Sequence, residues 1–338
     1  MSGFGFRLST TLFALTNEWL SREYTFESLV AKTVELGFGP GLEIVGFQSV
    51  RGYPNLDPEF ERSFKNLVER YELEPSCLSA NIDMARRADR LMTQDEVKES
   101  LAAQVEFGRR LGFPVVKAQK LEDDLYPWAA DLAEKAGVKL GIEIHAPVFV
   151  EHPLVVGLSE VYDRIDSPAL GFVQDWSSTM TALPTGQLRA FERNGLTRDQ
   201  TDFLRELWNR GGAPNDLFGE FAERARSEGA AEQAINQVRI VFNMFARNDP
   251  RGWLELMPRV IHVHAKFYEL EADGTDASIP HHELFDVLIE GGYEGYVSSE
   301  WEAHAWADMD DQDGFEMVRR HQELYRKLLA ERTAGTLA

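Results

Sequence analysis

The chain has 338 residues, of which 43% are hydrophobic and 27% are charged, a balance normal for a globular protein of one large or two ordinary domains. Its 35 basic and 56 acidic residues give a formal charge of −21, which disfavours nucleic acid and anionic membranes as partners because phosphate binding needs a basic surface. The single cysteine, Cys77, excludes an internal disulfide and indicates a reducing, cytoplasmic location, and no apolar run reaches the roughly 18–20 residues of a membrane span.

Strand and helix patterns alternate along the chain. In chain order, apolar runs typical of buried strands occupy residues 4–15, 41–47, 75–81, 114–118, 138–144, 169–174, 260–265 and 295–299. Helical patterns occupy residues 26–36, 58–71, 94–111, 123–136, 154–165, 281–289 and 315–329. Thr25, Asp57 and Thr93 stand where a capping residue starts a helix, and Gly112 and Gly137 stand where glycine ends one.

Eight strands, most of them separated by a helix, predict parallel pairing through right-handed crossovers. They close most simply as a (β/α)8 barrel, the TIM-barrel fold. We expect one domain over residues 1–330 and a flexible tail at residues 331–338. A doubly wound open sheet is the alternative, and the lack of a glycine-rich phosphate loop after the first strand disfavours it.

The connection between Asp175 and Val260 is unusually long. It contains 84 residues, where about 30 would carry one helix and its loops. Helical patterns occur at residues 199–209, 216–226 and 231–245. We expect one of these helices to serve the barrel wall and the others to form an insertion, at about residues 176–255, on the sixth strand–helix loop. Such an insertion acts as a lid or a partner surface, or simply packs on the barrel.

The strand at residues 138–144 leads into Glu143 and His145, which point to the same face because strand side chains alternate. A carboxylate on an otherwise apolar strand is costly unless it is paired or binds a metal. Pro147 then ends the strand because it has no N–H to donate. The alternative is an ordinary strand end whose polar residues reach water.

Three later strand ends carry similar groups. Asp175 follows the sixth strand, His262 and His264 share one face of the seventh, and Glu300 follows the eighth. The C-terminal ends of barrel strands gather on one rim, where barrel enzymes place their chemistry. Two glutamates, one aspartate and one histidine form a hard, mainly oxygen-donor site that suits Mn²⁺ or Mg²⁺, with Co²⁺ or Zn²⁺ as alternatives.

In these strand ends the chain resembles the xylose isomerase-like barrels, also called the sugar phosphate isomerase/epimerase family. The resembling runs are Glu143-Ile144-His145, Phe172-Val173-Gln174-Asp175, His262-Val263-His264-Ala265-Lys266 and residues 291–300. The resemblance covers nearly the whole chain apart from the insertion. It implies one divalent metal held by Glu143, Asp175, His264 and Glu300. His264 rather than His262 matches the family's His-x-Lys-Asp pattern, in which Phe267 replaces the Asp here.

A narrower resemblance is to the alpha, or catalytic, subunits of bacterial C-glycoside deglycosidases, and residues 141–147, 264–269 and 299–304 carry it. It implies Mn²⁺, a small beta subunit as partner, and an elimination that splits the sugar–aglycone carbon–carbon bond of a 3-keto C-glycoside. The alternatives are a ketose or sugar phosphate isomerase or epimerase, and a non-catalytic metal- or sugar-binding barrel. We also expect an oligomer.

Both enzymatic interpretations require removal of a proton from a carbon beside a sugar carbonyl. His145 is the predicted base, since a neutral imidazole titrates near working pH, and a hydrogen-bonding role is its alternative. Glu43, within the second strand, either binds substrate or forms an ion pair inside the barrel. Weaker predictions of substrate contact concern side chains near the rim, namely Lys117, Lys266, Trp176, Trp301 and Glu302. The tryptophans could instead be packed.

Overall fold

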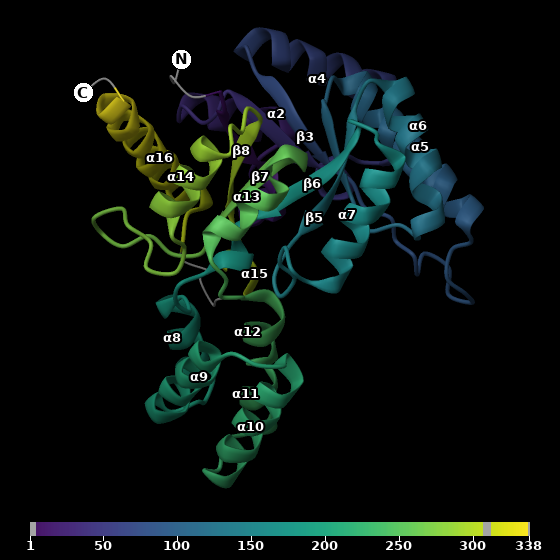
Figure 1. Cartoon of the computed structure of the whole chain (residues 1–338). Coiled ribbons are helices and arrows are strands. Elements are labelled where there is room, and N and C mark those ends of the chain that lie inside the picture. The colour runs from purple at the N-terminus through teal and green to yellow at the C-terminus, as the bar shows by residue number, and fades with distance from the viewer. Residues whose placement is uncertain (1–4, 307–311, 337–338) are drawn as a thin grey trace.

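Within the described residues, 5–306 and 312–336, eight parallel strands close into a barrel in the order of the chain (Figure 1). The strands of this computed structural model are β1 (Arg7–Thr11), β2 (Gly41–Val45), β3 (Glu74–Ser79), β4 (Val115–Ala118), β5 (Lys139–Ile144), β6 (Leu170–Asp175), β7 (Val260–Phe267) and β8 (Tyr296–Trp301). The closed barrel confirms the (β/α)8 fold that the alternation of strand and helix patterns predicts.

Helices that follow the strands cover the outside of the barrel. They are α2 (Phe26–Glu35), α4 (Pro58–Tyr71), α5 (Gln94–Leu111), α6 (Tyr126–Ala136), α7 (Pro153–Ile165), α14 (His281–Glu290) and α16 (Gly314–Thr336). In α5 the buried residues Val97, Leu101, Val105 and Gly108 recur every three or four positions, which places them on one face. A Cβ on Gly108 would lie 2.9 Å from Cγ2 of Val116, so glycine allows α5 to approach β4 closely.

Capping residues fix where these helices begin. Thr25 and Thr93 form capping boxes at α2 and α5, and the Asp57 carboxylate accepts the backbone N–H of Glu59 at α4. These contacts satisfy backbone donors that the first turn of a helix leaves unpaired. The three helix starts therefore agree with the capping residues read from the sequence.

Most predicted boundaries lie within three residues of the observed ones, and two differ more. The first strand, expected at residues 4–15, ends at Thr11, because Thr11 Oγ1 accepts the N–H of Phe13 and starts the 3-10 helix η1 (Leu12–Leu15). The tail, expected from residue 331, is helical to residue 336. Arg332 holds this end of α16 by donating to the Asp286 carboxylate and the His282 carbonyl of α14. Residues 1–4, 307–311 and 337–338 lie outside the described part.

Helices between β6 and β7 form a lobe that projects from the barrel (Figure 1). They are α8 (Thr185–Arg193), α9 (Arg198–Arg210), α10 (Pro214–Ser227), α11 (Glu232–Asn236) and α12 (Arg239–Met244). Buried side chains such as Leu204, Phe221 and Val241 give the lobe an apolar interior. We expected a long helix of this connection at the barrel wall, but the short α13 (Trp253–Leu256) packs beside α14 instead. The indole of Trp253 is fully buried and packs edge-on against the Phe149 ring, with the ring centroids 5.5 Å apart.

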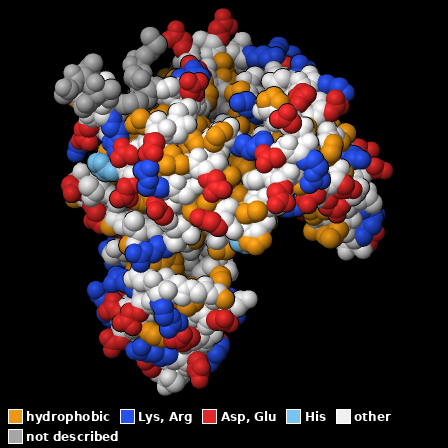
Figure 2. Space-filling model, in the orientation of Figure 1, with side chains coloured by type: hydrophobic (Ala, Val, Ile, Leu, Met, Phe, Trp, Pro, Cys, Tyr) orange, Lys and Arg blue, Asp and Glu red, His pale blue; other side chains and the backbone are white. Residues whose placement is uncertain are grey.

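Short segments complete the described chain, namely α1 (Thr16–Leu20), α3 (Gly46–Ser49), α15 (Ala303–Trp306), η2 (Asp123–Leu125), η3 (Trp176–Thr179), η4 (Pro250–Gly252) and η5 (Met257–Arg259). Acidic and basic side chains are intermixed over the barrel and the lobe on the face that Figure 2 shows. Among the described residues, none of the helices combines the length and the apolar content needed to cross a bilayer.

Two glycine-to-alanine changes test the backbone conformations of this fold. Gly112 ends α5 in the left-handed region, at φ +84°, where a Cβ costs about 1–2 kcal/mol, so we expect Gly112→Ala to destabilise the protein. Gly157 lies inside α7 with open space for a Cβ, and Gly157→Ala should stabilise the protein by about 0.5–1 kcal/mol. Urea unfolding midpoints measure both changes, and shifts of the same sign would contradict the assigned conformations.

Candidate active site

Strand register brings the predicted metal ligands together at one rim of the barrel. Asp175 of β6 pairs with His264 of β7, and Lys266 of β7 pairs with Glu300 of β8. Glu143 of β5 lies beside β6, and its strand ends at the same rim because the sheet is parallel. As a result, one ligand atom from each of Glu143, Asp175, His264 and Glu300 lies within 4.8 Å of the others.

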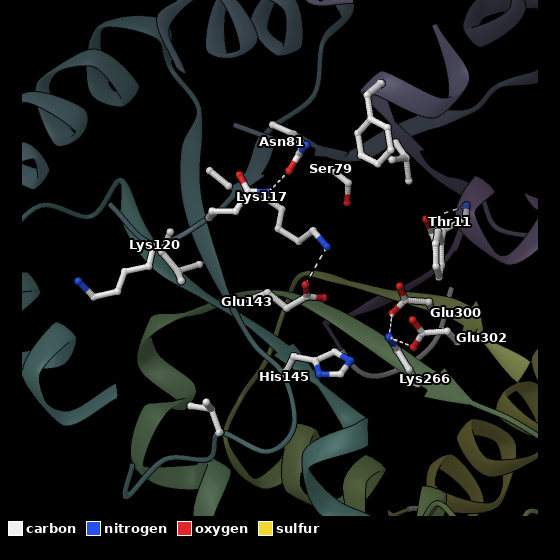
Figure 3. A pocket seen from close by; sticks show the side chains of 18 of the residues that line it. Thr11, Ser79, Asn81, Lys117, Lys120, Glu143, His145, Lys266, Glu300 and Glu302 are labelled. Atoms are coloured by element: carbon white, nitrogen blue, oxygen red, sulfur yellow. Dashed lines mark hydrogen bonds and ion pairs between the residues drawn. The ribbon is translucent and has the colours of Figure 1, made fainter. Parts of the chain in front are cut away.

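The contacts within this group of four are close. His264 Nδ1 lies 2.5 Å from Glu143 Oε1 and 3.2 Å from Glu300 Oε2. The ammonium of Lys266 lies 3.0 Å from Asp175 Oδ2 and 3.3 Å from Glu300 Oε2, and it also donates to Glu302 (Figure 3). The second oxygen of Glu143, Oε2, accepts a hydrogen bond of 2.9 Å from Lys117. Each carboxylate therefore faces at least one cationic or imidazole group.

The carboxylates outnumber the cations around this point. Among the described residues, the barrel interior and rim bring together the carboxylates of Glu43, Glu143, Asp175, Glu300 and Glu302. The lysine side chains of Lys117 and Lys266 supply two positive charges against these five carboxyl groups. An excess of buried negative charge is unfavourable unless a cation or protons compensate it. A divalent cation would remove most of that excess.

Two carboxylate oxygens in the group of four have ion-pair contacts but no hydrogen bond within the described part of the chain. Asp175 Oδ2 and Glu300 Oε2 are buried and accept no hydrogen bond from the residues that the structure describes, although both face the Lys266 ammonium. Buried polar atoms in proteins are almost always hydrogen-bonded or bound to an ion. One imidazole nitrogen and several carboxylate oxygens within a few ångströms form a donor set that fits a hard divalent metal.

The local electrostatics favour positive charge at this point. Burial raises the pKa of Glu300 and raises that of Glu302 to about 7. Burial acts in the same direction on Glu143, but Lys117 and His264 outweigh it and hold the pKa of Glu143 well below its usual value. Burial alone would lower the pKa of His264, yet the neighbouring carboxylates, led by Glu300, raise it well above the usual range. The carboxylates thus attract a proton or another cation to the position that His264 Nδ1 faces.

His145 follows β5 and faces the same space. Its Nδ1 lies 2.7 Å from the carbonyl oxygen of Ala146. A carbonyl oxygen only accepts, so Nδ1 carries the proton, and in the neutral ring the lone pair is on Nε2. His145 Nε2 is buried and has no hydrogen-bond partner among the described residues. The ring thus presents a basic nitrogen beside the predicted ligands.

A cavity of about 530 Å³ opens over these groups, within the usual size range of small-molecule sites. Its polar lining includes Lys117, Glu143, His145, Lys266, Glu300 and Glu302 (Figure 3). Phe47 after β2 and Met244 at the end of α12 add apolar surface, so the lobe contributes to the cavity wall. The chamber combines charged groups that can hold sugar oxygens with apolar side chains that can contact an attached ring.

The two predicted tryptophans do not contact this cavity. Trp176 is fully buried and packs its indole among Phe285, Tyr325 and His281 outside the barrel. Trp301 is fully buried as well, and its Nε1 donates to the Tyr268 carbonyl. The prediction that these two residues bind substrate is therefore wrong. Adjacent strand residues point to opposite faces, and each tryptophan follows an inward-facing acid, so its side chain turns to the outside.

Other residues at the cavity were not predicted. Ser79 and Asn81 line it at the end of β3, as does Thr11 at the end of β1 (Figure 3). The C-terminal ends of all eight strands gather on this rim. Had the first four strands been searched in the same way as the last four, these polar strand ends would have been identified. Met244 carries no such signal, because its place depends on how the lobe folds back over the barrel.

Comparison with known proteins finds close relatives of the whole chain, although no protein-family model matches it. The 3'-dehydrocarminate deglycosidase alpha subunit of Microbacterium sp. is 36% identical over 335 residues, which cover 96% of each chain. A C-glycoside deglycosidase alpha subunit of Arthrobacter globiformis is 37% identical over 331 residues, which cover 95% of this chain and 90% of the relative.

Solved structures share the barrel at much lower identity. The structure of L-ribulose 3-epimerase matches with a TM-score of 0.55 and 14% identity, covering 98% of both chains. A D-allulose 3-epimerase from Methylomonas sp. matches with a TM-score of 0.54 and 11% identity, covering 96% of this chain and 98% of the other. At these identities the likeness shows the fold alone.

Removal of one carboxylate from the group of four tests whether it binds metal. Loss of a residue that only hydrogen-bonds to a metal ligand typically weakens metal binding by about 10–100-fold. We expect Glu300→Gln to weaken Mn²⁺ binding by more than this, because the change replaces a charged ligand with a neutral amide. Titration calorimetry measures the affinity, and the Mn²⁺-dependent rise in unfolding temperature should shrink in parallel.

The matched control is Glu290→Gln, which breaks an exposed 2.7 Å ion pair with Arg251 far from the cavity. This variant should bind Mn²⁺ as the wild type does. Equal affinity of the Glu300 variant and the wild type would show that Glu300 is not a ligand.

Proposed function

The chain belongs to the family of C-glycoside deglycosidase alpha subunits, and we propose that it cleaves the carbon–carbon bond between the sugar and the aglycone of a 3-keto C-glycoside. The observation that carries this proposal is the Nε2 of His145, which has no hydrogen-bond partner among the described residues, beside four clustered ligand groups. His145 and two of these groups, Glu143 and Glu300, line a cavity of small-molecule size. This arrangement supplies what proton removal next to a carbonyl requires, namely a base and a place for a cation.

We propose that Glu143, Asp175, His264 and Glu300 hold a divalent metal, with Mn²⁺ as the first choice. The set contains three carboxylates, one imidazole and no thiolate, which is a hard donor set. Mg²⁺ and Co²⁺ are the alternatives. When bound, such an ion supplies a Lewis acid that polarises the sugar carbonyl and stabilises negative charge on its oxygen.

The proposed base is His145. The carbon between the carbonyl and the anomeric carbon carries the proton to be removed, and Nε2 has the lone pair to accept it. The hydrogen bond from Nδ1 to the Ala146 carbonyl keeps the ring oriented and keeps the lone pair on Nε2. Lys117 and Lys266 line the same cavity as permanent cations that can hold sugar oxygens, and Glu302 can accept from sugar hydroxyls.

The elimination balances without an oxidant or reductant. The electron pair of the broken C–H bond becomes a double bond to the anomeric carbon. The pair of the sugar–aglycone bond then leaves with the aglycone carbon, which needs a proton. The imidazolium of His145 carries the proton removed in the first step and can return it, so the products are an unsaturated keto sugar and the free aglycone.

We propose that the chain works with a partner subunit. Its relatives are named as alpha subunits, which supports a second, different chain. Phe47 at the cavity is 62% exposed, which leaves a large apolar side chain at a rim that a partner would cover. We further propose a cytoplasmic, reducing location, consistent with the free, buried thiol of Cys77.

Product analysis in D₂O tests the proposed reaction. The Mn²⁺-loaded wild type, with its partner subunit co-purified, should release aglycone from a 3-keto C-glycoside. His145→Ala should lower the rate by about 10²–10⁴-fold while still binding Mn²⁺, because it removes the base and none of the proposed ligands. His282→Ala, at an exposed histidine of α14, should keep full activity.

Two results would contradict the proposal. Deuterium incorporation into the sugar without aglycone release would assign an isomerase or epimerase. Equal turnover by the wild type and His145→Ala would show that His145 is not the base.

A further inference from the structure

We infer that Glu43 is a positioning residue that fixes the imidazole of His264 with Nε2 protonated and Nδ1 free to bind metal. This inference rests on the metal centre proposed above and adds a residue to it that lies on a different strand, β2. The sequence leaves Glu43 with two alternatives, a substrate contact or an ion pair inside the barrel. Glu43 does not line the cavity, and its carboxylate pairs with the imidazoles of His262 and His264, as the second alternative predicts.

Glu43 is fully buried inside the barrel and both of its oxygens are engaged. Oε1 lies 2.9 Å from His264 Nε2 and accepts a 2.8 Å hydrogen bond from the Ser79 hydroxyl. Oε2 lies 2.9 Å from His262 Nε2. A buried carboxylate is costly without such donors, so the groups that surround Glu43 also hold it in place.

These contacts set the tautomer of His264. A carboxylate oxygen accepts hydrogen bonds, so His264 Nε2 carries the hydrogen in its contact with Glu43. In a neutral imidazole the lone pair is then on Nδ1, and that atom lies 2.5 Å from Glu143 Oε1 and 3.2 Å from Glu300 Oε2. Nδ1 thus points into the predicted ligand set. A metal-binding histidine generally has its second nitrogen held by such an acceptor, which orients the ring and makes the ligand more basic.

The same residues could instead form a second metal site, because ligand atoms of Glu43, His262 and His264 also lie within 4.8 Å of one another. The hydrogen bonds favour the positioning role. Both Glu43 oxygens have donors, whereas Asp175 Oδ2 and Glu300 Oε2 at the rim accept no hydrogen bond from the described residues. Among the described residues, the rim oxygens contact only the Lys266 ammonium and the His264 imidazole and retain capacity to bind an ion, whereas the Glu43 oxygens are already engaged.

Metal binding by Glu43 variants tests this inference without an activity assay. Wild type, stripped with a chelator and titrated with Mn²⁺, should bind one equivalent. Glu43→Leu removes the acceptor and should raise the Mn²⁺ dissociation constant by about 10–100-fold. Glu43→Gln keeps one amide oxygen that can accept from His264 Nε2–H, and its dissociation constant should lie between those of Glu43→Leu and the wild type.

Ser298→Ala is the matched control. It removes a hydroxyl that lies 3.1 Å from His262 Nε2, inside the same buried group, and leaves the Glu43–His264 contact intact. Its dissociation constant should equal that of the wild type. A second readout is the ¹⁵N spectrum of histidine-labelled protein loaded with diamagnetic Mg²⁺, which should show His264 protonated at Nε2, with the His264→Asn variant identifying the signal.

The outcomes separate this inference from the proposed function. Unchanged Mn²⁺ affinity in both Glu43 variants, or a His264 protonated at Nδ1 in the Mg²⁺ form, would overturn the positioning role and leave the metal centre standing. Two equivalents of Mn²⁺ in the wild type, with one lost in Glu43→Gln, would overturn it in favour of a second ion. If Glu43→Leu does not fold, Glu43→Gln and the spectrum decide. If the wild type binds no divalent ion, both the proposed metal centre and this inference are wrong.

Discussion

The compensation of buried negative charge is the constraint on which the active end of this barrel depends. Parallel strands deliver Glu143, Asp175 and Glu300 to one rim, where Asp175 and Glu300 are buried and carboxylates close to one another repel. Lys117 and Lys266 compensate part of this charge. Lys117 contacts Glu143, and the Lys266 ammonium contacts both Asp175 and Glu300. Without a bound cation, the clustered carboxylates lower the stability of the folded protein, as is common at functional sites.

The insertion is physically tied to this charge cluster. Asp175 Oδ1 accepts the backbone N–H of Ser177, and the Ser177 carbonyl accepts the N–H of Ala246, just beyond the last helix of the lobe. Asn248 also donates to the Ser178 carbonyl. The lobe thus enters and leaves the barrel through segments that are hydrogen-bonded to each other beside a proposed ligand. Its position affects both the cavity wall, through Met244, and the surroundings of the Asp175 carboxylate.

The sequence predicted the barrel and the convergence of four acidic or imidazole groups because both follow from local rules. Strand alternation, helix capping and the gathering of strand ends on one rim need no knowledge of distant contacts. The failures have two causes. Trp176 and Trp301 adjoin inward-facing acids and point outward, as the alternation of strand side chains requires once the acids are placed inside. The contact between Glu43 and His264 crosses the barrel from β2 to β7, and it depends on barrel closure, which a linear pattern does not encode.

The most direct test of this account is a crystal structure of the Mn²⁺-loaded protein with data collected at the manganese absorption edge. The account predicts one anomalous peak per chain at about 2.0–2.3 Å from donor atoms of Glu143, Asp175, His264 and Glu300. A peak centred between Glu43 and His262, or no peak in fully loaded protein, would contradict it.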